Sequence, residues 1–255
     1  MIKKADCAAA RFFNERDSSM DDSRYNVFQT DDGFWCIEQT FVRSFLFVGE
    51  REALLVDCLL DGDLKARCEN ITDKPIRVII THADGDHTGC AGQFDKVYMH
   101  PAEFDRYSLK NKAAAPASPL WEGDVIDIGT FRFEVVLIPG HTPGSIALLE
   151  REKRFLIGGD SIQSGPIFLF GEGRNVAAFL ASMEKLKKLR ESFDKVYASH
   201  HGLTEDPAVI DDLASFAADV IAGDLPEPRE DPGGKAPPYV KLYSRGKAHF
   251  LLAER

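Results

Sequence analysis

The stretch that decides the fold is residues 76–89, IRVIITHADGDHTG, in which an apolar run leads directly into a cluster of metal-binding side chains. The run 76–80 is short and mostly β-branched, which is typical of a buried strand. The loop after it offers four imidazole or carboxylate groups within six residues, at His82, Asp84, Asp86 and His87. A loop this rich in nitrogen and oxygen ligands can contribute to two metal sites at once.

Three more strand-like segments end at residues that can bind a metal. They are residues 131–138, 155–157 and 195–199, followed respectively by His141, by Asp160 and by the pair His200 and His201. Ligand sites of open sheets lie beyond the carboxyl ends of the strands, so we expect these side chains to converge on one cleft. The convergence of four separate segments is the central prediction from the sequence.

His200 and His201 compete for one position in this cleft. Neighbouring residues of a strand point to opposite faces, so we expect only one of the two to enter the site. We favour His201, which directly precedes Gly202.

The other segments predict a mixed α/β chain. Residues 27–37 and 41–58 are expected to form antiparallel strands, with a turn at 32–33, and residues 63–70 a short helix. A second helix is expected from residue 176, with Asn175 as its N-cap. A third is expected to have Asp206 as its N-cap and to stop at Gly223. Residues 225–238 carry five prolines and are expected to connect to one last strand at 239–252.

Composition limits the classes of protein that fit. A chain of 255 residues with 44% hydrophobic content predicts a single domain, 1–255, and a formal net charge of −10 argues against a nucleic-acid partner. The chain lacks a run of about 20 apolar residues, and charged residues interrupt 1–20, so neither a membrane span nor a signal peptide is expected. The five cysteines are odd in number and unpaired in spacing, which favours reduced thiols and a cytoplasmic location.

The order of these candidate ligands resembles the metallo-β-lactamase superfamily. The signature of that family is His-x-His-x-Asp-His, followed by a distant His, an Asp and a final His, and residues 82–87 here read His-x-Asp-x-Asp-His. By eye the resemblance extends roughly over residues 41–202. It implies a four-layer αββα sandwich.

The resemblance also implies a ligand set for two metal ions. His82 and His141 would bind the first ion, Asp86, His87 and His201 the second, and Asp160 would bridge them. Zinc is the expected metal of both sites, with iron or manganese as alternatives.

Two aspartates need separate comment. Asp84 stands where the family has its second histidine; a carboxylate can still bind metal there, as in the flavodiiron branch, and its harder oxygen shifts preference toward iron or manganese. Asp57, after the strand-like 53–56, resembles the family's aspartate that supports a ligand imidazole.

The function implied is a metal-dependent hydrolase that cleaves a small-molecule ester, thioester, lactone or phosphoester with a hydroxide held between the ions. Asp86 is expected to orient that hydroxide and manage its proton. Arg174 lies in the segment 161–175 that leads to the second helix, and it is interpreted either as a contact for an anionic substrate group or as an exposed charge. The glyoxalase II branch is disfavoured because residues 225–255 do not resemble its helical C-terminal domain.

Two other function classes are kept as alternatives. The carboxylate at Asp84 would also suit an iron-containing redox protein, either flavodiiron-like or persulfide dioxygenase-like, although no flavodoxin-like domain follows. The third alternative is a non-catalytic metal-binding module. The sequence leaves open whether the chain acts alone or as a homodimer.

Overall fold

The structure is a computed structural model that describes residues 24–110, 115–231, 233–234 and 236–254. Residues 1–20, where no leader is expected, therefore lie outside the described part. A seven-stranded sheet is antiparallel from β1 to β4 and parallel from β4 to β7. Its strands are β1 (Asn26–Asp31), β2 (Phe34–Gln39), β3 (Val42–Val48), β4 (Ala53–Val56), β5 (Ile76–Ile79), β6 (Val97–Met99) and β7 (Ala117–Pro119).

A six-stranded sheet faces the first. Its spatial order is β14, β13, β11, β10, β9, β8, and only the β11–β13 pair is parallel. These strands are β8 (Val125–Asp127), β9 (Arg132–Leu137), β10 (Ile146–Glu150), β11 (Phe155–Ile157), β13 (Lys195–Tyr197) and β14 (Thr204–Glu205).

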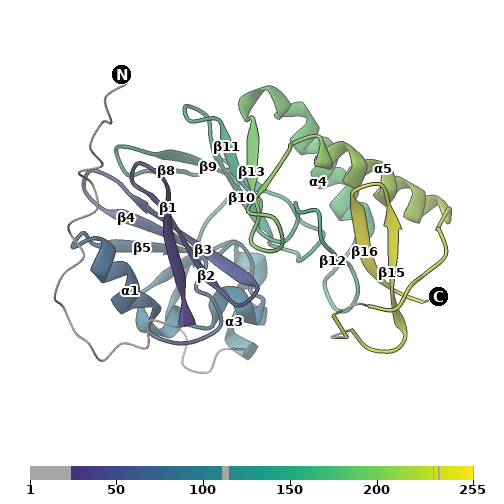
Figure 1. Ribbon diagram of the computed structural model, residues 1–255, viewed down its shortest axis with the longest axis horizontal. Helices are drawn as coiled ribbons and strands as arrows, with labels where there is room; N and C mark the ends of the chain where they lie inside the picture. The colour runs from purple at the N-terminus through teal and green to yellow at the C-terminus, as the bar shows by residue number, and fades with distance from the viewer. Residues whose placement is uncertain (1–23, 111–114, 232, 235, 255) are drawn as a thin grey trace, which may run out of the picture.

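Helices cover the outer face of each sheet, so the chain forms four layers (Figure 1). On the first sheet lie α1 (Leu64–Ile71) and α3 (Phe104–Lys110), and on the second α4 (Val176–Lys188) and α5 (Val209–Ala222). The one-turn α2 (Gly85–Thr88) lies within the loop after β5. The expected αββα sandwich is confirmed.

Aromatic side chains fill the space between the two sheets. The ring of Phe34 stacks on Phe47 with centroids 4.3 Å apart and on Phe155 at 5.7 Å, and all three are buried. Phe34 and Phe47 come from the first sheet and Phe155 from the second. Burial of such large rings is a major source of stability. The stacked rings hold the two sheets together, and the loops with the candidate ligands leave the ends of their strands.

A second apolar cluster lies between the six-stranded sheet and the helices α4 and α5. Phe250 stacks on Phe216 at 4.8 Å and meets Phe179 edge-on at 5.4 Å. Phe250 belongs to a third, three-stranded sheet of order β12, β16, β15 that packs beside α5 (Figure 1). Its strands are β12 (Ile167–Phe168), β15 (Val240–Arg245) and β16 (Ala248–Ala253).

The C-terminal prediction was wrong in one respect. The single strand expected over 239–252 is a hairpin, β15–β16, which turns at Gly246 with a φ of +58°. Glycine adopts this left-handed conformation without steric cost, and the turn lets both strands pair. Before the hairpin, Arg229 in the proline-rich connection forms a bridge with Leu242 of β15.

The helix ends follow the expected signals with one shift. The Asn175 side chain accepts a hydrogen bond from the Ala178 amide at 2.9 Å and caps α4, as predicted. The helix α5 begins at Val209, not at 207, because Asp206 instead caps a turn through the Ala208 amide at 2.8 Å. It ends at Gly223, as predicted, with a φ of +80°. Within the described ranges, none of the helices has the length and apolar character needed to cross a bilayer.

Candidate metal centre

The ends of four parallel or facing strands bring the candidate ligands together. His82 lies three residues beyond β5, His141 four beyond β9, and Asp160 and His200 three beyond the parallel neighbours β11 and β13. Asp57 follows β4, whose parallel pairing with β5 places the Asp57 amide 2.8 Å from the Ile79 carbonyl. The sheet registers therefore determine which side chains meet.

These residues form three overlapping groups whose ligand atoms lie within 4.8 Å of one another in each group. The groups are His82, Asp84 and His141; Asp86, His87 and His200; and His82, His87 and Asp160. Except for Asp84 and Asp86, which are partly exposed, every member is buried.

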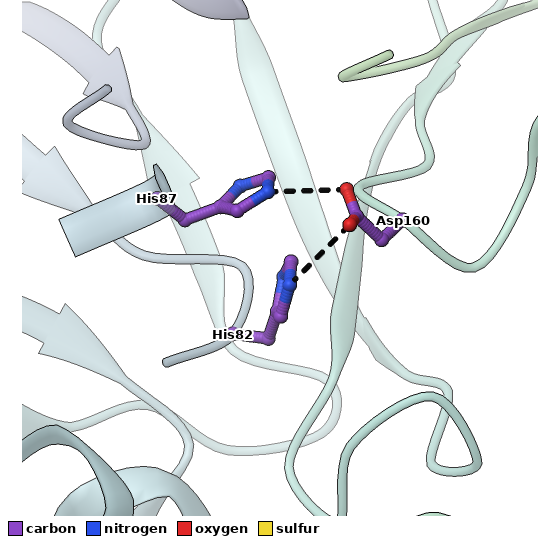
Figure 2. A group of neighbouring side chains, drawn as sticks. All are labelled: His82, His87 and Asp160. Carbon is purple, nitrogen blue, oxygen red and sulfur yellow. Dashed lines mark ion pairs between the residues drawn. The ribbon is translucent and has the colours of Figure 1, made fainter. Parts of the chain in front are cut away.

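Asp160 lies between the first two groups. Its Oδ1 is 3.1 Å from Nε2 of His87 and 3.1 Å from Nε2 of His200. Its Oδ2 faces the other group, 3.8 Å from Nε2 of His82 and 3.7 Å from Nε2 of His141. Figure 2 shows the rings of His87 and His82 directed at different oxygens of this carboxylate. One carboxylate therefore faces two separate sets of nitrogens.

Each imidazole is oriented by a bond on its far side. Nδ1 of His141 donates to the Phe168 carbonyl at 2.9 Å, and Nδ1 of His200 donates to the Phe41 carbonyl at 2.6 Å. A carbonyl oxygen can only accept, so Nδ1 carries the proton and Nε2 presents a lone pair to the cluster. This is the arrangement of metal-binding histidines.

Asp57 orients the other two imidazoles. Its Oδ2 accepts from Nδ1 of His87 at 2.7 Å and from the Thr81 hydroxyl at 2.8 Å. With that hydroxyl donating to Asp57, the Thr81 oxygen is free to accept from Nδ1 of His82 at 3.1 Å. The structure therefore places Asp57 in the supporting position that the sequence predicted.

Two buried atoms test whether a cation fits. Nε2 of His87 and Oδ1 of Asp160 are buried and have no hydrogen-bond partner among the described residues, although they lie only 3.1 Å apart. When the only ring proton of His87 is the one that Nδ1 donates to Asp57, both atoms present lone pairs and neither can donate to the other. Buried polar atoms are rarely left unpaired, and a cation between them would satisfy both. The residues present fit a metal ion.

The carboxylates remain ionised despite their burial. Burial would raise the pKa of Asp160, but His200, His87 and His82 hold that pKa well below its usual range. Burial would likewise raise the pKa of Asp84, but the adjacent imidazoles of His141 and His82 hold it well below its usual range. Charged carboxylates are the form that binds metal.

Asp84 is held by two arginines. Its Oδ1 accepts from Nε of Arg106 at 3.0 Å and from Nη2 of Arg106 at 2.6 Å, and its Oδ2 accepts from Nη2 of Arg174 at 2.6 Å. The same Oδ2 lies 3.3 Å from Nε2 of His141 and 3.6 Å from Nε2 of His82. Asp84 thus occupies the place of a third ligand in the first group.

The geometry assigns Arg174 mainly to support. Besides Asp84, it donates from Nε to the His141 carbonyl at 3.0 Å and from Nη1 to the Phe170 carbonyl at 3.3 Å. The interpretation as an exposed charge is wrong, because the side chain is only 12% exposed. The contact with a substrate anion stays a prediction.

The structure brings His200 into the cluster and leaves His201 out, which corrects the sequence-based choice. His201 is exposed, has a left-handed φ of +57°, and belongs to none of the three groups. Arg43 fixes this loop, with Nη1 donating to the Ala198 carbonyl at 3.2 Å and Nη2 donating to the His201 carbonyl at 2.5 Å. The fixed carbonyls determine which imidazole turns inward.

A fully buried glutamate joins two ligand-bearing loops. Oε2 of Glu103 accepts from the Ala83 amide at 2.8 Å, and Oε1 accepts from the Gly144 amide at 2.7 Å. Ala83 lies between His82 and Asp84, and Gly144 lies three residues after His141. Sequence reasoning missed Glu103, Arg43 and Arg106, because each acts on residues more than 18 positions away and nothing in its local pattern marks the role.

Members of the cluster line a pocket of about 880 Å³. They are Asp84, Asp86, Asp160, His141 and His200, and Phe41, Phe168 and Leu251 add apolar side chains to the same lining. Such a volume matches a small-molecule ligand.

Comparisons with known proteins agree with this geometry. Acyl-coenzyme A thioesterase MBLAC2 of Gallus gallus is 28% identical over 179 residues, 58% of this chain and 65% of the relative, so the match spans just under two thirds of that protein. Hydroxyacylglutathione hydrolase GloC of Haemophilus influenzae is 26% identical over 180 residues, 62% of this chain and 84% of the relative.

Solved structures share the fold. A metallo-beta-lactamase from Pontibacter korlensis superposes with a TM-score of 0.66 at 14% identity, over 76% of this chain and 99% of that one. A beta-lactamase domain protein from Burkholderia ambifaria gives a TM-score of 0.63 at 21% identity, over 80% of each chain. The family model described as the metallo-beta-lactamase superfamily matches residues 37–200. From the matched span, the αββα layers and the ligand cluster together, the chain belongs to the metallo-beta-lactamase superfamily of metal-dependent hydrolases.

Proposed function

We propose that this hydrolase cleaves a small-molecule carboxylic thioester with the help of two divalent metal ions. The observation that carries the proposal is the position of Asp160, which lines the pocket and whose two oxygens face two separate groups of imidazole nitrogens. A carboxylate between two nitrogen sets suits a bridging ligand of a metal pair.

The two ions would have matching ligand sets, each with two imidazoles and one carboxylate, and would share Asp160. His82, Asp84 and His141 would bind the first ion, Asp86, His87 and His200 the second, and Asp160 both. Four imidazoles against three carboxylates favour zinc. Bound as a pair, divalent ions polarise a carbonyl oxygen and lower the pKa of water enough to supply hydroxide near neutral pH.

Asp86 is the residue best placed to manage the proton. It is the partly exposed member of the second group, lines the pocket, and has Oδ2 3.4 Å from Nε2 of His200. In the reaction, water adds its oxygen to the acyl carbon, the carbon–sulfur bond breaks, and the thiol leaves with a proton. Asp86 would take the proton from the attacking water and return it to the sulfur. No protein nucleophile takes part.

The apolar lining at Phe41, Phe168 and Leu251 suits the hydrocarbon part of an acyl group. The choice of a thioester among acyl substrates is supported by two related proteins. One, from Gallus gallus, is named an acyl-coenzyme A thioesterase, and the other, from Haemophilus influenzae, a hydroxyacylglutathione hydrolase. The relative from Haemophilus influenzae weakens the argument that residues 225–255 disfavour a glutathione thioester as substrate.

The test combines metal analysis with a substrate panel. Purified protein is expected to contain about two ions per chain and to hydrolyse a short acyl-coenzyme A or S-lactoylglutathione faster than a lactone or a phosphodiester. Asp86→Asn is expected to lower kcat on the thioester by about 10²- to 10⁴-fold, while Asp95→Asn, at an exposed position, leaves it unchanged. Hydrolysis of the lactone or phosphodiester alone, or no metal in the purified protein, would overturn the proposal.

A further inference from the structure

We propose that Arg106 and Asp84 act as one unit that replaces a histidine in the first metal group, with Arg106 as a positioning residue for the Asp84 ligand. This inference rests on the proposed function, because it concerns the ion that His82, Asp84 and His141 would hold. It adds the residue that determines how tightly, and for which metal, that group binds.

First, Arg106 holds the carboxylate of Asp84 through two hydrogen bonds to one oxygen. Two nitrogens of its guanidinium, Nε and Nη2, both donate to Oδ1 of Asp84, at 3.0 and 2.6 Å. Charge-assisted bonds of this kind are strong and directional. Oδ1 is therefore turned away from the metal group, and only Oδ2 faces His82 and His141.

The second step concerns charge. Asp84 adds one negative charge to a site that already holds Asp86 and Asp160, where an imidazole would add none. The adjacent guanidinium of Arg106 cancels that charge in an environment where its side chain is only 23% exposed and that of Asp84 14%. The Asp84–Arg106 pair carries no net charge, as a neutral imidazole would carry none. Because Arg174 also binds one side of Oδ2, the carboxylate keeps one direction of Oδ2 for His82 and His141.

The third step is the rigidity of the support. Arg106 belongs to α3, three residues after Glu103, whose buried carboxylate binds the Ala83 amide next to Asp84. Glu103 ends the 3-10 turn Pro101–Glu103, which runs directly into α3. This turn and the start of α3 thus hold both the backbone before Asp84 and its side chain, and Arg174 holds Oδ2 from the other side at 2.6 Å.

The proposal predicts the direction in which affinity for the first ion changes when Arg106 is replaced. If Arg106 merely repelled cations, Arg106→Gln would tighten metal binding, because it removes a positive charge next to the site. If it positions Asp84, the same change weakens the first ion by about 10- to 100-fold, the usual effect of losing a partner of a metal ligand. With Oδ1 released and Oδ2 still bound by Arg174, Asp84 can present a second hard oxygen to the site, so the ratio of zinc to manganese affinity falls.

The experiment titrates metal-free protein with Zn²⁺ and with Mn²⁺ in calorimetry, alongside thermal unfolding to confirm that each variant is folded. Arg106→Gln is expected to weaken the first ion and leave the second unchanged. Asp84→His alone is expected to lose the first ion, because it leaves the guanidinium charges of Arg106 and Arg174 beside an imidazole without a carboxylate. The double variant Asp84→His/Arg106→Gln removes one of these charges and is expected to regain first-ion binding.

Arg77→Gln is the matched control. Arg77 also binds one carboxylate through Nε and Nη2, that of Glu52 at 3.1 and 2.8 Å, but away from the metal groups. Equal or tighter first-ion binding in Arg106→Gln, or full binding in Asp84→His alone, would overturn the inference. A wild-type protein that binds no metal would instead refute the proposed function, so the two failures are distinguishable.

Discussion

Oδ2 of Asp57 lies 2.7 Å from Nδ1 of His87, and both side chains are almost completely buried. The two residues lie 30 positions apart in the sequence, and Asp57 holds a left-handed φ of +64°. A non-glycine residue pays for that conformation in strain. The contact that the strain allows fixes the proton of His87 on Nδ1.

Replacing Asp57 tests this contact. In Asp57→Asn, an amide that turns its oxygen to His87 presents its NH₂ group to the Thr81 amide, which is also a donor and binds Oδ1 at 2.7 Å in the native protein. We expect zinc affinity to fall by about 10- to 100-fold, measured by competition with a chromogenic chelator. Asp63→Asn, at an exposed position without a side-chain capping bond, serves as the control, and an unchanged affinity in Asp57→Asn would contradict the assignment.

The two adjacent histidines should differ sharply. His200→Ala removes an imidazole from the second group, so we expect about one ion fewer per chain by elemental analysis. His201→Ala removes a ring outside the three groups and should leave the metal content unchanged. The reverse result would contradict the assignment of His200 to the second group.

Glu103 should contribute to the free energy of unfolding through its two buried hydrogen bonds. In Glu103→Gln, one side-chain oxygen becomes an NH₂ group facing either the Ala83 or the Gly144 amide, so one buried donor loses its acceptor. We expect a loss of about 1–3 kcal/mol in the free energy of unfolding, measured by urea denaturation. Glu152→Gln, in the exposed turn between β10 and β11, should change it by less than about 0.5 kcal/mol; a Glu103→Gln variant as stable as wild type would rule out the buried role.

Removing the metal should destabilise the protein. A ligand that binds only the folded state at about 100 times its Kd adds about 2.7 kcal/mol. In a chain of this size we therefore expect EDTA to lower Tm by roughly 5–10 °C, with recovery on addition of zinc. A Tm insensitive to both treatments would argue against the metal groups at His82, His87 and Asp160.

The sequence was most informative where function and local structure coincide. His82, Asp86, His87, His141 and Asp160 each follow a strand closely, and in an α/β sheet this placement alone predicts that they meet. The caps at Asn175 and Gly223 were also predictable, because each signal acts within a few residues. Both helix ends depend on residues close to them in the sequence, and the structure confirms both.

What could not be predicted depends on distant partners. Alternation along a strand says that only one of His200 and His201 points inward, but the choice is made by Arg43, more than 150 positions earlier, through its bonds to the carbonyls of the loop. The same holds for Arg106 at Asp84. The C-terminal hairpin is a different case, since Gly246 was a turn signal within an otherwise continuous β-like run.

The hydrogen bond from His141 to the Phe168 carbonyl also connects the candidate metal centre to the C-terminal hairpin. Phe168 belongs to β12, which is paired to β16 of the C-terminal hairpin, so the hairpin and the imidazole share one piece of backbone. Linkage is reciprocal. If docking of the hairpin raises the affinity of the centre for an ion by some factor, binding of the ion favours docking of the hairpin by the same factor. Amide protons of β16 thus become reporters of occupancy at a centre whose three ligand groups contain no residue of the hairpin.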